Sequence, residues 1–128
     1  MAEPNAILST FSSAIAGVVA AAAPAVVSVH SRRSRASGFV WKAGLVVTAD
    51  ETLADEGEVA IRLADGTTRS ATIAGRDHTT DIALLKADTS GLTPAKLSTS
   101  VPALGSLSVV VAADRGIPGH GGPLDLPQ

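Results

Sequence analysis

The sequence predicts an all-β fold, a partly closed barrel or a sandwich, with one helix at its N-terminal end. Seven short segments with the composition of β-strands fall within about 90 residues, and no helical pattern separates them. Glycine, aspartate and proline punctuate these segments, as they do in turns. Because unpaired sheet edges invite further pairing, a domain with this many short strands is expected to close its sheet.

Residues 1–23 are predicted to form the helical segment. Asn5 can cap the helix, because its side-chain oxygen can accept a hydrogen bond from a free backbone N–H group. Large apolar side chains then recur at intervals of three and four residues, at Ile7, Leu8, Phe11, Ile15, Val18 and Val19. Pro24 ends the helix, since proline disfavours a helical conformation of the residue before it. We expect the apolar side of this helix to pack against the barrel.

Residues 24–88 are predicted to form the barrel itself. The first three strands are AVVSVHS, SGFVWK and LVVTA, with a tight turn at KAG between the last two. The stretch EVAIRLADGTTRSATIAGRD alternates apolar and polar residues and carries Asp65 and Gly66, where a type I′ hairpin turn is expected. DIALLKAD supplies a further strand.

Residues 89–113 are predicted to be a connector that leads into one more strand. The connector carries Pro94 and Pro102, and the strand is LGSLSVVVAAD. Residues 114–128 are rich in glycine and proline, and we expect this tail to be poorly ordered.

The composition argues against several classes of function. Ten basic and twelve acidic residues give a formal charge of −2, which provides no basic surface for nucleic acid. Arg32, Arg33 and Arg35 lie among serines and glycine, so we predict a solvated loop, with a contact to an anion as the alternative. No cysteine is present and the histidines are far apart, so we expect neither a metal site nor a cofactor.

The apolar stretch Ala14–Val29 has the composition of a signal peptide but not the flanks of one. The segment before it carries Glu3 and no basic residue. Pro24 interrupts the stretch, which is shorter than the roughly 20 residues that span a bilayer. The sequence therefore predicts no membrane span. The lack of a convincing signal peptide points to the cytoplasm, but the sequence leaves the cellular compartment open.

Four stretches in one order carry a resemblance to a known family: APAVVSV, SGFVWKAGLVVTA, IRLADGTTRSATIAGRDHTTDIALLK and LGSLSVVVAADRG. From about Ala23 to Gly116 the chain resembles the N-terminal half of the HtrA/DegP-type serine proteases. The resemblance implies a trypsin-like, six-stranded β-barrel, the N-terminal half of a two-barrel protease. It also implies that LGSLSVVVAAD is the first strand of a second barrel, which is largely missing.

In this family a histidine acts as base toward a serine, and an aspartate orients the histidine. Asp81, in TTDIALL, matches the catalytic aspartate. The histidine position, three residues after Thr48, holds Glu51 in TADET. A carboxylate cannot do the work of the imidazole, and a second carboxylate at Asp81 would repel it. The resemblance therefore implies a lost site, and the other acids of DETLADE are predicted to form its solvated loop.

The serine of the family lies in the motif G-N-S-G-G-P. Aligned on Gly-Gly-Pro in GHGGPLDL, the serine position is His120, either as the remnant of an internal deletion or by coincidence. His78, three residues before Asp81, is predicted to be exposed rather than catalytic. No serine nucleophile can be placed, because none of the downstream hydroxyls lies in a glycine-flanked elbow: Ser98, Ser100, Ser106 and Ser108.

We therefore predict an HtrA-like protease homologue that is catalytically inactive and acts as a protein-binding or scaffold module. A truncated serine endopeptidase of the HtrA/DegP type is one alternative. A small protein-interaction module unrelated to proteolysis is another. The expected partners are proteins or peptides. Because the family often trimerises through its N-terminal segment, the helix at residues 7–23 could instead serve a homo-oligomer.

Overall fold

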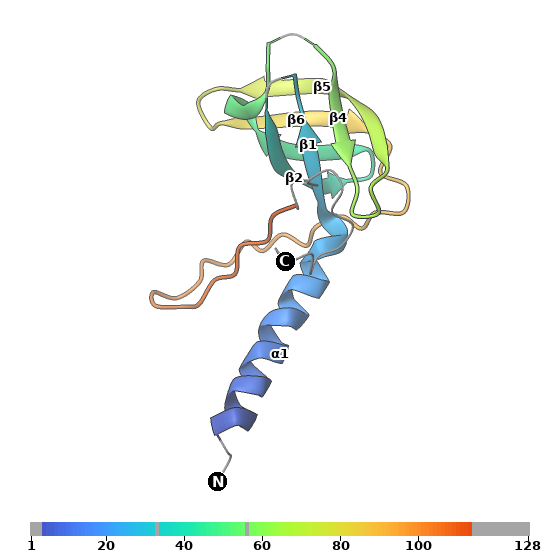
Figure 1. Ribbon diagram of the computed structural model, residues 1–128. Helices are drawn as coiled ribbons and strands as arrows, with labels where there is room; N and C mark the ends of the chain where they lie inside the picture. Colours follow the sequence, from blue (N-terminus) through green and yellow to red (C-terminus); the bar gives the residue numbers. More distant parts are fainter. Residues whose placement is uncertain (1–3, 33, 56, 114–128) are drawn as a thin grey trace.

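One α-helix and six β-strands make up the part of the chain that the structure describes (Figure 1). This computed structural model describes residues 4–32, 34–55 and 57–113. The helix α1 (Pro4–Ala22) leads through a 3₁₀ turn, η1 (Ala23–Ala25), into the first strand. The strands are β1 (Val26–His30), β2 (Arg35–Lys42), β3 (Leu45–Ala49), β4 (Val59–Arg62), β5 (Thr68–Asp77) and β6 (Ile82–Ala87), and a second 3₁₀ turn, η2 (Asp50–Thr52), follows β3.

The strands form one closed antiparallel barrel in the order β1-β2-β3-β6-β5-β4. Closure comes from the pairing of β1 with β4, in which Val29 lies opposite Ile61. A closed sheet has no free edge, which removes the backbone groups that would otherwise pair with another chain. The predicted six-stranded barrel with an N-terminal helix is thus confirmed.

Alternation along the strands fills the barrel interior. Val27 and Val29 of β1 belong to the barrel core. Ser28 between them faces the other side of the strand, where it is also buried, with 5% of its surface exposed. The interior is built almost entirely from valine, leucine and isoleucine, and its buried members are Val27, Val29, Val40, Val46, Leu53, Val59, Ile61, Ala83 and Leu85. Gly38 is also buried. A larger residue does not fit there, because a Cβ would lie 2.9 Å from both Val29 Cγ2 and the Val47 carbonyl oxygen.

Two turns were expected from the sequence, and both occur, one of them with a different geometry. The β2–β3 turn has Gly44 at φ +82°. Between β4 and β5, the Gly66 N–H donates to the Leu63 oxygen (2.9 Å) and Gly66 alone takes a positive φ, +90°. A type I′ turn would need a positive φ at Asp65 as well. The loop is instead a three-residue hairpin turn, in which the Asp65 carboxylate accepts hydrogen bonds from Thr67.

The predicted seventh strand is wrong over its described part, residues 104–113, which form no strand. A strand needs a neighbouring backbone for its N–H and C=O groups, and within the described residues none pairs with this segment. The connector instead touches the barrel at single points. The Thr93 N–H donates to the Pro24 oxygen (3.4 Å) and the Ala95 N–H to the Val40 oxygen (2.8 Å). The tail predicted over residues 114–128 lies outside the described residues.

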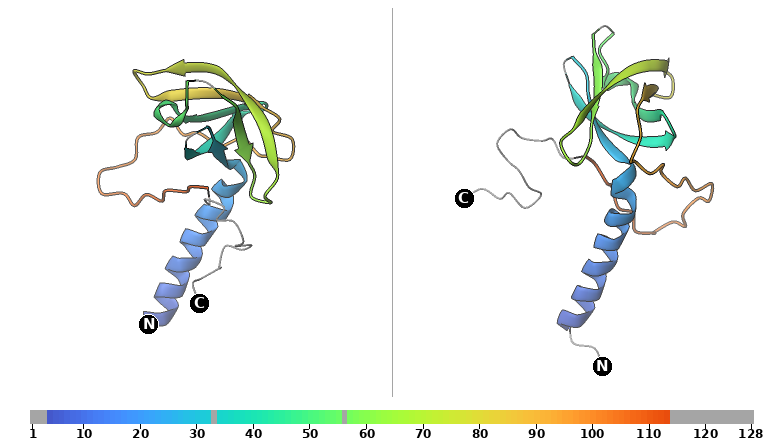
Figure 2. Two further views of the ribbon diagram at one scale, coloured as in Figure 1. Left: turned by 45° about the horizontal axis from the view of Figure 1, so that its top comes forward. Right: turned by 90° about the vertical axis from the view of Figure 1, so that its right-hand side faces the viewer.

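The expectation that the helix packs against the barrel is wrong. No residue of α1 is buried, and both views in Figure 2 show the helix projecting away from the barrel. With η1 it forms 22 residues of mean hydropathy 1.8, from Pro4 to Ala25, which is long and apolar enough to cross a membrane by length and composition. The apolar stretch is therefore longer in structure than the sequence pattern indicated.

The arginine loop also differs from expectation, because Arg35 belongs to β2 and pairs with His30 of β1.

Candidate active-site remnant

The end of β3 and the start of β6 bring the predicted site residues together. Ala49 lies opposite Ile82 in the β3–β6 ladder, and the chain then turns through η2. Just beyond the ladder the Asp50 N–H donates to the Asp81 backbone oxygen (3.1 Å). The pairing of two strands therefore fixes how the segment after β3 lies against the segment before β6.

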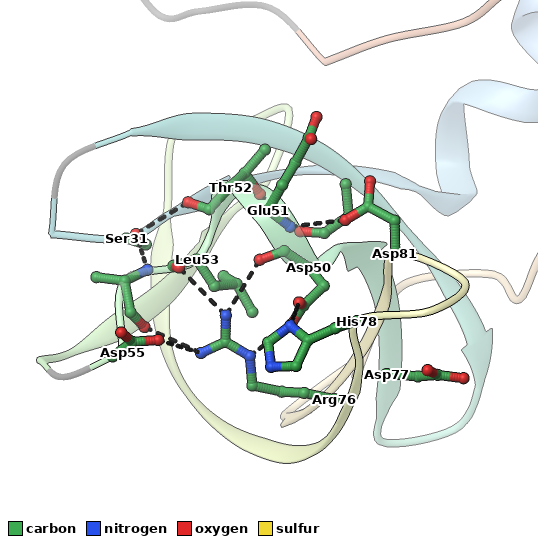
Figure 3. Close-up of polar contacts among 12 residues, drawn as sticks. Ser31, Asp50, Glu51, Thr52, Leu53, Asp55, Arg76, Asp77, His78 and Asp81 are labelled. Atoms are coloured by element: carbon green, nitrogen blue, oxygen red, sulfur yellow. Dashed lines mark hydrogen bonds and ion pairs between the residues drawn. The ribbon is translucent and has the colours of Figure 1, made fainter.

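Glu51 and Asp81 meet through a backbone hydrogen bond. The Glu51 N–H donates to Asp81 Oδ1 at 2.8 Å (Figure 3). Asp81 has φ +59°, the left-handed conformation that a short polar side chain tolerates better than most. The Glu51 side chain is exposed, and its carboxylate extends into solvent. The two positions that the family resemblance matched are thus adjacent in space, while the two carboxylates do not bond to each other.

Asp50 is not part of a solvated loop, so that expectation is wrong for this acid. The residue is buried, with 2% of its surface exposed. Arg76 Nε donates to Asp50 Oδ1 at 2.5 Å, and His78 Nδ1 contacts the other carboxylate oxygen. A buried charge is tolerated only when it is paired and hydrogen-bonded, and these two partners from the end of β5 meet that condition. Asp55 does match the expectation, since its side chain is 95% exposed.

The Arg76 guanidinium holds the whole turn after β3. It donates to the backbone oxygens of Asp50 (3.2 Å), Leu53 (3.3 Å) and Ala54 (3.3 Å). It also lies 3.6 Å from the carboxylate of Asp55. One planar group with five N–H donors can satisfy several acceptors at once, which lysine cannot do in this geometry. Arg76 therefore fixes the segment that presents Glu51.

The electrostatics of this cluster favour an ionised Asp50. The hydrogen bond from Arg76 is the main cause that holds the pKa of the Asp50 carboxyl below its usual value. The charge of Arg76 and the contact with His78 also lower this pKa, whereas burial of the carboxyl acts to raise it. His30 behaves differently: burial, and then the charges of Arg35 and Arg62, lower the pKa of its imidazole.

Neither described histidine contacts Asp81. The side chain of His78 is 80% exposed, as predicted from the sequence. Its contact with Asp50 was not predicted. His30 Nε2 lies 3.0 Å from Ser28 Oγ on the outside of β1. The connector serines do not join the cluster either, and the Ser98 hydroxyl accepts from the Ser100 N–H (3.1 Å) within its own loop. His120 lies outside the described residues.

The Asp50–Arg76 pair is the part of the site that the sequence did not reveal. GRD was recognisable only as one piece of a family pattern, and the four acids of DETLADE looked alike. The one available signal was position, because Asp50 follows a buried strand directly and so had to be either paired or displaced. Within the described ranges, no group of three or more possible metal ligands gathers here or elsewhere.

Comparison with known proteins identifies the family to which the barrel belongs. The trypsin-like peptidase domain family matches residues 36–125. This chain is 39% identical to the probable periplasmic serine endoprotease DegP-like of Pseudomonas putida strain W619. It is 38% identical to the protein of the same description from Ectopseudomonas mendocina strain ymp. Both matches run over 69 residues, 53% of this chain. The serine endoprotease of Yersinia pestis, known from a crystal structure, superimposes with a TM-score of 0.66 and 29% identity over 71% of this chain.

The coverage of the relatives is partial. The chain spans 14% and 15% of the length of these two DegP-like proteins and 36% of the Yersinia pestis chain. The family match takes in most of β2, the strands β3 to β6 and the contact between Glu51 and Asp81. From the family match over 90 of its 128 residues (36 to 125), this chain belongs to the trypsin-like peptidase domain family, as an HtrA/DegP-like member.

Proposed function

We propose that this chain is a non-hydrolytic HtrA/DegP-type homologue that binds protein or peptide partners. One observation carries the proposal. Glu51 occupies the position that follows β3 and donates its backbone N–H to Asp81, where the family resemblance calls for the catalytic histidine. The aspartate and its scaffold are kept, but the group that would take a proton from a nucleophile is not an imidazole.

The chemistry of the two side chains explains why this exchange abolishes catalysis. A neutral imidazole accepts a proton at one nitrogen while its other N–H is held by the aspartate. An ionised carboxylate has acceptors only, so the side chain of Glu51 cannot donate to Asp81 while it accepts from a serine. Two neighbouring negative charges also repel each other. The Asp81 carboxylate is engaged by the Glu51 backbone N–H instead.

A binding role is supported by the exposed apolar side chains of the connector. Segments with several largely exposed, large apolar residues usually mark contact sites with other proteins. Here they are Leu97, Val101, Leu104, Leu107 and Val110, each at least 62% exposed. A cleft of about 620 Å³ also opens beside Glu51, between the η2 turn and the loop that follows β1. An extended peptide could use either surface.

The test of inactivity is a protease assay with fluorescently labelled, unfolded casein. The full chain is expected to give no turnover above buffer, and Asp81→Ala is expected to leave this unchanged. Casein anisotropy, measured in parallel, is expected to rise on binding. Turnover that disappears in Asp81→Ala would show an active protease and end the proposal. No turnover together with no anisotropy change would end the binding part of it.

A truncated serine endopeptidase remains the second candidate, and one observation favours it. The relatives named above are serine endoproteases, and this chain spans only part of their length. In that case a second barrel, formed by residues outside 1–128, would supply the nucleophilic serine. Coding sequence downstream of Gln128 that contains G-x-S-G-G-P would favour this candidate. It would also predict that Glu51→His in the longer protein raises turnover, because it supplies the missing base.

A further inference from the structure

We propose that the outer face of β4, β1 and β2 binds a small organic molecule that carries a phosphate monoester. The proposal goes beyond the binding of protein partners and does not depend on it. It rests on three features of this face: the side chains that the strand register brings together, the cavity beside them, and the sign of their charges.

The first feature is a set of polar side chains that share one face of the sheet. β1 runs between β4 and β2 in the barrel (Figure 1). Its core valines alternate with Ser28 and His30, which therefore face the outer side of the strand. Ser28 lies opposite Arg62 of β4 and Ser37 of β2, and His30 lies opposite Arg35 of β2. Residues directly opposite each other share a face, so these five residues form one surface, here called the basic face.

The second feature is a cavity of about 780 Å³ at the basic face. Four members of the face line it, together with the loop after β1 and the end of the connector: Ser28, His30, Arg35 and Ser37. The Ala113 N–H donates to Ser37 Oγ at 2.9 Å and so fixes the connector as one wall. Proteins bind small organic ligands in cavities of roughly 300–1,000 Å³. The cavity is distinct from the cleft beside Glu51, although Arg32 and Ser34 line both.

The third feature is the sign of the charge. No acid is found among the described residues that line the cavity, whereas His30, Arg32 and Arg35 are basic. Within the described part of the chain, no acid forms an ion pair with Arg32. Burial, and then the charges of Arg35 and Arg62, lower the pKa of His30. The two arginines thus create a positive potential at the imidazole, and the same potential attracts an anion.

The donors of the basic face match a phosphate monoester better than a carboxylate. A phosphate monoester carries a charge of about −1.5 to −2 at pH 7 and has three strong acceptor oxygens. The guanidiniums of Arg35 and Arg62 supply two positive charges, and each can bind two phosphate oxygens with its planar fork. A carboxylate has a single negative charge and would leave one of the two arginines uncompensated. The cavity also has room for the organic part of a phosphate ester.

Binding of the dianion is expected to be linked to protonation of His30. The charged groups around its ring are Arg35 from β2 and Arg62 from β4, and the loop after β1 adds Arg32 to the same cavity. On its own strand Ser28 Oγ lies 3.0 Å from Nε2, and the connector contributes only two alanines to the cavity. A bound dianion favours the imidazolium, so the pKa of His30 should rise. By linkage, the protonated form should bind the ligand more tightly.

The test is a calorimetric titration of the full chain, in a non-ionic detergent, with phenyl phosphate and with benzoate, which carries the same ring on a carboxylate. Phenyl phosphate is expected to bind about tenfold more tightly than benzoate. Arg35→Gln/Arg62→Gln is expected to weaken the binding of phenyl phosphate by about tenfold. Lys42→Gln/Lys86→Gln is the matched control, because it removes two exposed positive charges that do not line the cavity. It is expected to bind like the parent chain.

Two further measurements keep the test independent of the folding of the double arginine variant. Arg35→Lys keeps the charge and loses the planar fork, and it is expected to weaken binding by about threefold. Proton NMR of the His30 ring follows its pKa, which is expected to rise by about 0.5 when phenyl phosphate saturates the parent chain. An unchanged pKa at saturation would place the ligand elsewhere and overturn the proposal.

Three other outcomes also overturn it. The first is the absence of saturable binding of phenyl phosphate at millimolar concentrations. The second is equal binding of phenyl phosphate and benzoate, or an equal loss in the arginine and lysine variants, since either means unspecific attraction between charges. The third is a blocked phosphoserine peptide that binds much more tightly than phenyl phosphate, which would replace the small molecule by a phosphorylated protein.

Discussion

The barrel and α1 contain the same kinds of apolar residue and treat them in opposite ways. In the barrel, Leu85 and Ile61 are 0% exposed. In α1, Leu8 and Ile7 are more than half exposed, and no residue of the helix is buried. The contrast teaches that the stability of this fold lies in the barrel alone. Within residues 4–32, 34–55 and 57–113, no part of the chain buries the apolar residues of α1.

The barrel is also closed by its own strands. Because β1 pairs with β4 as well as β2, its first strand is held from both sides without help from the helix. The helix contributes only its covalent link through η1, where Ala25 is buried at 4% exposure. Matched substitutions in the two regions test this division, and they are ordered below from the largest expected effect to the smallest.

The largest difference is expected from the same truncation at two leucines. Leu85→Ala opens a cavity in the barrel and should lower the free energy of unfolding by about 2–5 kcal/mol. Leu8→Ala changes an exposed side chain and should stay within about 0.5 kcal/mol. Urea unfolding followed by Trp41 fluorescence measures both. Equal losses at the two sites would mean that the helix is part of the cooperative core.

Two glycines give a second matched pair. Gly38→Ala adds a Cβ 2.9 Å from Val29 Cγ2 and from the Val47 oxygen, and this overpacking should lower the free energy of unfolding by about 1–3 kcal/mol. Gly17→Ala meets nothing within 4 Å and should raise helix content slightly, without changing the unfolding midpoint of the barrel. Circular dichroism and tryptophan fluorescence separate the two effects. A destabilising Gly17→Ala would contradict the isolation of α1.

Acid should weaken the barrel through Asp50. The folded pKa of this carboxyl lies below its unfolded value of 3.8, so its stabilising contribution is complete above that value. The contribution is lost as the pH falls through the folded pKa. Asp50→Asn should therefore lower the urea midpoint at pH 7 and flatten its decline below about pH 4. Asp55→Asn, whose side chain is 95% exposed, is the control and should follow the parent curve.

The smallest effect is expected from removing α1 altogether. A chain lacking residues 4–22 should keep the unfolding midpoint of the barrel in urea, because the helix buries no residue. Its solubility without detergent should increase, since the exposed apolar side chains of the helix are gone. A fall in the midpoint comparable to that of Leu85→Ala would show that the barrel depends on the helix.

The sequence was sufficient for the barrel because strand alternation and turn residues are local signals. The pattern around Val27 and Val29 and the glycine at Gly44 indicated strands and a turn where they occur. The type I′ turn was not borne out, because the carboxylate of Asp65 bonds Thr67 and stabilises another geometry. The seventh strand failed for a related reason: β-propensity describes a segment, while a strand exists only with a partner.

Long-range partners explain the other differences. Asp50 looked like its neighbours in DETLADE, and its burial depends on Arg76, 26 residues further on. The adjacency of Glu51 and Asp81 followed from the family resemblance, but the hydrogen bond that joins them needed coordinates. The helix pattern identified an apolar side but not the surface that covers it. The prediction that this side packs against the barrel was therefore wrong. Each of these depends on contacts between distant residues that no local pattern records.

The pairing of β3 with β6 also determines when the barrel can form during translation. The barrel cannot close until Ala87 has left the ribosome, because β6 completes the ladders with β3 and with β5. The helix needs only its own backbone hydrogen bonds and emerges more than sixty residues earlier, ending at Ala22. During that interval α1 can complete its own backbone hydrogen bonds, whereas the barrel still lacks β6. Any surface that receives the helix can therefore do so before the barrel exists.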